Sequence, residues 1–205
     1  MDCIDRNKVN DYLKRHLKSS RYTHSLGVVT MAVRIGESLP VDEAFTERLR
    51  LAALCHDIAK CETPESMNRL IRTYGLEEKY LYLPQLAHSK VGAAMLKTDF
   101  HIDDEELLRA VAYHTTGRAG MSLMEKIIYV SDAIEPNRTY PDRKAYERLA
   151  LRDLDLCCYA VLDFTIKDVA SKGRKQDPDA LAAYEEYKAR FGNLDFRALL
   201  HEHTE

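Results

Sequence analysis

The stretch LAALCHDIAK, residues 51–60, places an adjacent histidine and aspartate at the end of an apolar helical face. In a helix, His56 lies one turn beyond Ala52 and Ala53, so His56 and Asp57 extend an apolar stripe with two ionisable side chains. Burying a carboxylate without a partner is costly, so Asp57 needs a cation beside it. The neighbouring imidazole favours a metal ion as that cation. We therefore expect the rest of the chain to supply further ligands.

Length and charge limit the classes of function. The 205 residues suffice for a single domain with its own hydrophobic core. The 30 basic and 33 acidic residues nearly cancel, which argues against nucleic acid and against a membrane surface as partners. No apolar run reaches the roughly 18 residues of a membrane span, and the N-terminus lacks the apolar core of a signal peptide. We expect a cytoplasmic protein.

The cysteines are odd in number, and no two of them have the two-residue spacing of a zinc knuckle or a redox motif. We interpret all of them as reduced thiols, and a small core residue is the usual role of a free cysteine. Two of them flank the central His-Asp pair, and the sequence leaves a redox role for these two open. The five are Cys3, Cys55, Cys61, Cys157 and Cys158.

Hydrophobic periodicity predicts an all-α fold, a compact helical bundle without strands, repeats or low-complexity linkers. We expect one domain over residues 1–205, with the metal-site core at about 20–140 and C-terminal helices in 144–203 packed on it. The predicted helices cover residues 8–17, 21–38, 42–60, 64–74, 122–132, 144–171, 180–190 and 194–201, with one further helix after Pro84 and another from 103 to 114.

Six ionisable residues fall on the apolar faces of five predicted helices. A single histidine on such a face is usually a hydrogen-bonded core residue, and a single aspartate often only caps or pairs. A core that holds four imidazoles and two carboxylates, however, has few stable arrangements besides coordination of one or two divalent cations. The candidate metal ligands are His24, His56, Asp57, His88, His114 and Asp132.

A site of this kind suits phosphoryl transfer. Two cations roughly 3.5 to 4 Å apart can share a bridging carboxylate and a nucleophilic hydroxide while they hold the oxygens of a phosphate. Asp57 is the candidate bridge, because it lies between the other ligands in chain order. Arg21 and Lys60 lie one helical turn from ligands, and Arg138 closely follows Asp132. These three cations either neutralise charge on a polyphosphate or are ordinary surface charges.

The order of the ligands, a histidine, a His-Asp pair, two histidines and an aspartate, resembles the HD-domain superfamily of metal-dependent phosphohydrolases. The closer resemblance, from about residue 21 to 187, is to the bacterial HD-domain family that splits dinucleoside tetraphosphates symmetrically, often called YqeK-like. Three strings carry it: LCHDIAK at 54–60, HTTGR at 114–118 and SDAIEPNR at 131–138. The last two strings distinguish this family from other HD proteins.

The resemblance implies a symmetrical bis(5'-nucleosyl)-tetraphosphatase, a hydrolase that cleaves diadenosine tetraphosphate at its central phosphoanhydride into two nucleoside diphosphates. It also implies two divalent metal ions, typically iron, although nitrogen and oxygen ligands accept manganese, cobalt or zinc as well. The implied ligands are His24, His56, Asp57 and Asp132 for one metal, and Asp57, His88 and His114 for the other.

The resemblance further implies that Lys60, Thr115, Gly117 and Arg138 line the nucleotide or phosphate pocket, with Asp57, Lys60 and Arg138 acting in catalysis. One position departs from the family pattern. Ser89-Lys90, directly after His88, stands where a glycine and a small or apolar residue are expected.

Three other functions are compatible with the sequence. Another HD phosphohydrolase would use the same metals on a mononucleotide or a cyclic dinucleotide. An HD-type di-iron oxygenase would use a similar ligand set on an organic substrate, but the phosphate-binding cations argue against it. A silent nucleotide sensor commonly lacks ligands, whereas all six positions are filled here. The base preference and the oligomeric state, for which a homodimer is one option, are not determined by the sequence.

Overall fold

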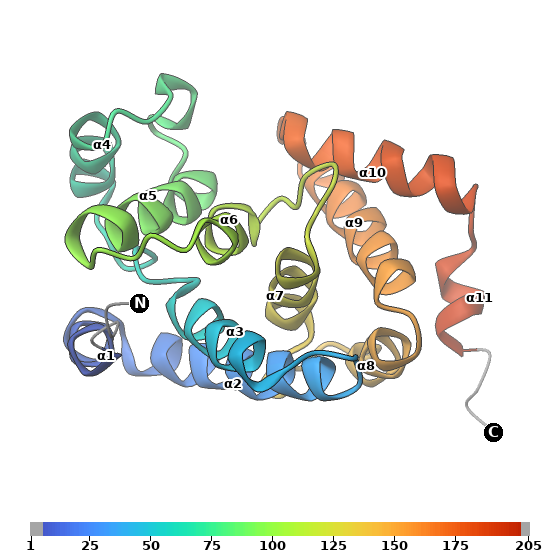
Figure 1. The fold of residues 1–205 in the computed structure, drawn as a ribbon. Coiled ribbons are helices and arrows are strands. Elements are labelled where there is room, and N and C mark those ends of the chain that lie inside the picture. The colour runs from blue at the N-terminus through green and yellow to red at the C-terminus, as the bar shows by residue number, and fades with distance from the viewer. Residues whose placement is uncertain (1–5, 202–205) are drawn as a thin grey trace.

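Helices build the described part of the chain, residues 6–201 of a computed structural model, and no strand occurs within it (Figure 1). This confirms the predicted all-α fold. Cys3 and residues 202 and 203 of the predicted C-terminal segment lie outside the described range. The elements are α1 (Arg6–His16), α2 (Ser19–Glu37), α3 (Glu43–Cys55), α4 (Pro64–Thr73), the 3-10 turn η1 (Glu78–Tyr80), α5 (Pro84–Asp99), α6 (Glu105–Tyr113), α7 (Leu123–Ile134), α8 (Arg143–Arg152), α9 (Leu154–Ser171), α10 (Pro178–Phe191) and α11 (Phe196–His201).

Four helices form a closed ring of contacts. α2 packs against α3, α3 against α6, α6 against α7, and α7 returns to α2. α5 lies along α6, and α9 covers the far side of α7, as Figure 1 shows. Helices distant in the sequence therefore present their side chains to one common centre.

α7 belongs to this ring and also contacts α8 and α9 outside it. Ile127 and Ile128 on adjacent sides of it are fully buried, as expected for a helix that is apolar nearly all round. Its start is fixed by a capping box: the Glu125 main-chain NH donates to the hydroxyl of Ser122, and the Glu125 carboxylate accepts from the Ser122 main-chain NH at 2.7 Å. The cap and the buried surroundings hold the C-terminal turn of α7, which carries Asp132, in one position.

One cluster of buried apolar side chains extends from Val9 in α1 to Leu200 in α11. A smaller cluster lies beneath α4, η1 and the first turns of α5. Cys55 belongs to the large cluster, where burial raises the pKa of its thiol to about 12, so this thiol is an unreactive core group. Within residues 6–201, no helix combines the length and the apolarity that a membrane span requires.

The prediction of one helix over residues 42–60 is wrong at its C-terminal end. α3 ends at Cys55, and the chain then turns tightly, with the Ile58 NH donating to the Cys55 carbonyl at 3.0 Å. The Ala53 carbonyl accepts from the His56 ring at 2.8 Å rather than continuing the helical ladder. Because Ile58 and Ala59 are buried as well, the apolar pattern runs through the turn and conceals it.

Residues 144–171 also differ from the prediction, because they form two helices rather than one. Asp153 separates α8 from α9, with an extended backbone at φ −152° and ψ 97°. Its side chain accepts from the Leu156 NH at 2.9 Å and so caps α9. The break lets α9 lie against α7 while α8 packs across both of them.

This cap gives a stability test. Replacing Asp153 by alanine leaves the Leu156 NH without its acceptor, so the free energy of unfolding should fall by about 1 kcal/mol. Urea denaturation measures this change. Asp153→Asn is the matched control and should stay near the wild type, because asparagine caps helices as well as aspartate does. Equal stability of the alanine and asparagine variants would show that the cap contributes nothing.

Candidate metal centre

Four histidine rings and two carboxylates meet inside the ring of helices. His24 comes from α2, His56 and Asp57 from the turn after α3, and His88 from α5, while His114 follows α6 and Asp132 lies on α7. The structure thus brings all six predicted ligands together. Their nitrogen and oxygen atoms lie within 4.8 Å of one another in three groups: His24, His56 and Asp57; His56, His114 and Asp132; and Asp57, His88 and His114.

Asp57 lies at the centre, with only 3% of its side chain exposed. Its Oδ2 lies 3.9 Å from Nε2 of His24 and 3.6 Å from Nε2 of His56. Its Oδ1 lies 3.3 Å from Nε2 of His88 and 3.5 Å from Nε2 of His114. Each oxygen of one carboxylate therefore faces its own pair of imidazoles, and within each pair the two Nε2 atoms are 3.2 Å apart.

Hydrogen bonds behind three of the rings determine which nitrogen carries the proton. Nδ1 of His56, His88 and His114 each faces a main-chain carbonyl, which can only accept. Nδ1 is therefore the donor, and Nε2 of the neutral ring keeps its lone pair toward the centre. Burial lowers the pKa of His56 to about 4 and also lowers the pKa of His88, which favours the neutral rings. The acceptors are the carbonyls of Ala53 at 2.8 Å, Pro84 at 3.2 Å and Val111 at 2.8 Å.

The ends of two helices explain the orientation of two of these rings. His56 and His114 are the C-cap residues of α3 and α6. The last carbonyls of a helix lack the NH partners that earlier carbonyls have. Each C-cap histidine folds its ring back onto the carbonyl three residues earlier, so that Nε2 points away from the helix and into the centre.

The arrangement fits a divalent cation. Two unprotonated Nε2 atoms facing each other cannot hydrogen-bond to one another, and Asp57 Oδ1 is a buried acceptor without a hydrogen bond in the described part of the chain. Buried acceptors without a donor are costly. A cation between the rings satisfies both Nε2 atoms and the carboxylate at once, and such donors suit first-row transition metals. The buried histidines and aspartates therefore fit divalent metal binding.

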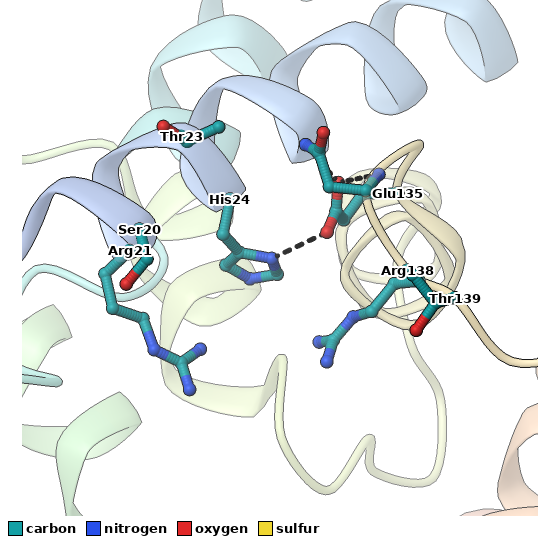
Figure 2. A pocket seen from close by; sticks show the side chains of 8 residues that line it. Ser20, Arg21, Thr23, His24, Glu135, Arg138 and Thr139 are labelled. Atoms are coloured by element: carbon teal, nitrogen blue, oxygen red, sulfur yellow. Dashed lines mark hydrogen bonds and ion pairs between the residues drawn. The ribbon is translucent and has the colours of Figure 1, made fainter.

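Glu135 is a site residue that the sequence analysis did not identify. His24 lies inside α2, and its Nδ1 faces Oε1 of Glu135 at 3.2 Å (Figure 2). Oε2 of Glu135 accepts from the main-chain NH of Asn137 at 2.7 Å, and a Cβ at Gly27 would clash with the same oxygen. A carboxylate behind a metal-binding histidine fixes its tautomer and raises its basicity. The signal is present in the string SDAIEPNR, where Glu135 stands three residues after the candidate ligand Asp132.

The three candidate cations all contact the cluster. Nη1 of Arg21 lies 3.3 Å from Asp57 Oδ2, and Nη2 of Arg138 lies 2.9 Å from Asp132 Oδ1. Nζ of Lys60 lies 3.7 Å from Asp57 Oδ1. Burial raises the pKa of Asp57, but the positive charge of Lys60 acts against burial, and the pKa of this carboxyl lies well below the usual range. Asp57 is therefore an anion flanked by positive charge on both sides.

Thr115 and Gly117 occupy different settings. The Thr115 hydroxyl lies 3.3 Å from Nε2 of His88 and 3.2 Å from Nε2 of His114, so it faces the cluster. Gly117 has a positive φ of 64°, which favours glycine, and a Cβ there would lie within 3.6 Å of Met121 and Leu162. Gly117 thus shapes the turn after α6, and its contact with a phosphate stays a prediction.

Two cavities open beside the cluster, and Arg138 lines both. The first, of about 550 Å³, lies in front of His24, where Figure 2 shows the Arg21 and Arg138 side chains reaching toward the same space. Its other lining residues are Ser20, Thr23, Glu135, Asn137 and Thr139. The second, of about 390 Å³, is lined by His114 and Asp132 of the cluster and by several aromatic rings, among them Tyr129, Tyr146 and Phe164. The site therefore offers room on two sides of the cluster.

The HD domain profile matches residues 21–137, a range that contains all six clustered residues. The chain belongs to the HD domain family. This confirms the broader of the two resemblances drawn from the order of the ligands.

Near full-length relatives support the closer resemblance. This HD domain is 36% identical over 182 residues to a protein of Halalkalibacterium halodurans named symmetrical bis(5'-nucleosyl)-tetraphosphatase, covering 88% of this chain and 96% of the relative. A Bacillus subtilis protein of the same name is 34% identical over 173 residues, covering 84% and 91%. The crystal structure of a predicted HD superfamily hydrolase involved in NAD metabolism from Clostridium acetobutylicum matches with a TM-score of 0.83 at 36% identity, covering 90% and 97%.

The Glu135 contact leads to a prediction about metal affinity. Glu135→Gln removes the negative charge behind His24, so the affinity for ferrous or manganous ion should fall about tenfold to a hundredfold. Competition with a chelating dye measures the affinity. Glu147→Gln alters another buried carboxylate, which pairs with Arg34 and Arg143, and should leave metal affinity unchanged. Unchanged affinity in Glu135→Gln would contradict the role given to Glu135.

Proposed function

We propose that this HD domain hydrolyses dinucleoside tetraphosphates, diadenosine tetraphosphate among them, at the central phosphoanhydride and releases two nucleoside diphosphates. The observation that carries the proposal is the Asp57 carboxylate set between two imidazole pairs, with a cation beside each of its oxygens. The names of the relatives that this chain matches over most of its length support the same reaction.

The proposed site holds a pair of divalent metal ions, with iron as our first choice. His24, His56, Asp57 and Asp132 would hold one ion, and Asp57, His88 and His114 the other. The division is supported by the orientation of Asp57, whose Oδ2 faces the first imidazole pair and whose Oδ1 faces the second. A bound pair supplies Lewis acidity toward phosphoryl oxygens and lowers the pKa of water.

The chain's own cations would bind and orient the polyphosphate. Arg21 and Arg138 lie on the Oδ2 side of Asp57, and Lys60 lies on the Oδ1 side, with Nζ 2.9 Å from Nε2 of His88. Positive charge thus flanks both sides of the centre, as a substrate with phosphates on both sides of the scissile bond requires. The leaving nucleoside diphosphate is a stabilised anion, so charge neutralisation by Lys60 and Arg138 suffices without a strong general acid.

Product analysis tests the proposed reaction. Incubation of the protein with diadenosine tetraphosphate and ferrous or manganous ion should give ADP as the sole nucleotide product on anion-exchange chromatography. In water enriched in oxygen-18, one of the two ADP molecules from each turnover should carry the label, because water attacks one inner phosphorus and the bridging oxygen leaves with the other half. AMP together with ATP would rule out central cleavage.

The bridging position of Asp57 gives a second prediction. Asp57→Ala should lose both metal ions and reduce turnover by at least about a thousandfold, because both sites share this carboxylate and the charge stabilisation of the transition state depends on them. Metal analysis and a turnover assay measure the two effects, and circular dichroism checks the fold. The matched control is Asp163→Asn, which changes a buried carboxylate on α9 that pairs with Lys167 and should keep its metal. Turnover retained in Asp57→Ala would refute the bridging role.

A further inference from the structure

A third cavity, here called the basic cavity, is walled by α2, α8 and the turn that follows α7. It measures about 350 Å³, within the roughly 300–1,000 Å³ of typical small-molecule pockets. Four of its lining side chains are cations and one is a carboxylate. The cations are Arg34, Arg143, Lys144 and Arg148, and the carboxylate is Glu147. Positive charge is therefore in excess around one concave surface.

The turn 135–138 separates the basic cavity from the metal centre. Pro136 lines the basic cavity, whereas its two neighbours, Glu135 and Asn137, line the first cavity. On α2, the two cavities meet different turns of the helix, with His24 in the wall of the first and Thr30 in the wall of the basic cavity. None of the six clustered residues lines the basic cavity. A ligand bound there is thus distinct from phosphates held at the metal centre.

The carboxylate of Glu147 does not neutralise the basic cavity. Its Oε1 accepts from Nη1 of Arg34, and its Oε2 accepts from Nη1 of Arg143 at 2.8 Å, so both oxygens are engaged. Lys144 and Arg148 have no hydrogen bond or ion pair with residues 6–201. They are exposed and four residues apart on α8, where like charges repel each other. An anion between them would relieve this repulsion.

Arg143 presents a fixed guanidinium group to the basic cavity. Its side chain is 14% exposed, and its Nη1 donates to the Ile134 carbonyl at 3.0 Å as well as to Glu147. Its Nε and Nη2 make no hydrogen bond to residues 6–201, and neither atom is closed off from solvent. A guanidinium group that is held in place and keeps free NH groups is well suited to phosphate oxygens.

We propose that the basic cavity is a second anion site, which binds a small molecule carrying phosphate groups through Arg143, Lys144 and Arg148. Four cations against one engaged carboxylate favour a ligand with more than one negative charge. The cavity is larger than an inorganic phosphate ion, so it also has room for an organic part. This site is additional to the proposed reaction and does not depend on it.

Nuclear magnetic resonance of the zinc-loaded protein tests the proposal, because zinc is diamagnetic. Titration with inorganic phosphate, and separately with fructose 1,6-bisphosphate, should shift the main-chain amide signals of Thr30, Arg34 and Lys144 to saturation. The signal of Thr115 reports binding at the metal centre separately. Tighter binding of the bisphosphate identifies a phosphorylated small molecule as the ligand, and tighter binding of inorganic phosphate identifies the free ion.

The double variant Lys144→Gln/Arg148→Gln removes the two unpaired cations. Its half-saturation concentration for either probe should rise about tenfold or more, since hydrogen bonds from charged donors are lost, while the response of Thr115 stays the same. Arg152→Gln is the matched control, because Arg152 is exposed one turn beyond Arg148 on α8 and does not line the cavity. It should bind both probes like the wild type.

Glu147→Gln should have the opposite effect. It removes the negative charge from the basic cavity, so the half-saturation concentration should fall about threefold. Tighter binding cannot result from a damaged fold. The proposal is overturned if neither probe shifts the three signals to saturation, if the double variant binds both probes as tightly as the wild type, or if Glu147→Gln binds them more weakly.

Discussion

The carboxylate of Asp57 is the group on which the rest of the structure depends. A buried anion is stable only when positive or polarised groups surround it, and here each oxygen faces two imidazoles and a cation. These groups arrive from α2, α3, α5 and α6, so the contacts among those helices are also what hold the carboxylate in place. The packing of these helices and the position of the Asp57 carboxylate therefore depend on the same contacts.

Main-chain carbonyls orient most of the imidazole rings in the cluster. Three of the four rings are oriented by a carbonyl of their own helix, two of them at helix ends where carbonyls lack NH partners. His24 lies inside a helix and uses the Glu135 carboxylate instead, which reaches α2 only because Gly27 has no side chain. The first imidazole pair consequently has a negative charge behind it that the second pair lacks.

Lys90, two residues after His88, connects α5 with the segment that carries His114. Its ammonium group lies 3.3 Å from the centre of the Tyr113 ring, while Arg118 contacts that ring at 5.4 Å. Arg118 in turn pairs with Glu125, the residue that completes the cap of α7. The Lys90 side chain thus supports Tyr113, which directly precedes His114, and links α5 to the turn that carries Thr115.

The sequence by itself determined the helical fold and the six clustered residues, because apolar periodicity reveals which side chains face the core, and His24, His56, Asp57, His88, His114 and Asp132 are polar exceptions on those faces. Only the tertiary structure decided where α3 ends, that Asp153 divides two helices, that Glu135 supports His24, and that Tyr129 and Phe164 share a cavity. Each of these depends on a side chain meeting a group from a distant segment or diverting a main-chain hydrogen bond. Periodicity reports that a face is buried, but not which partner covers it.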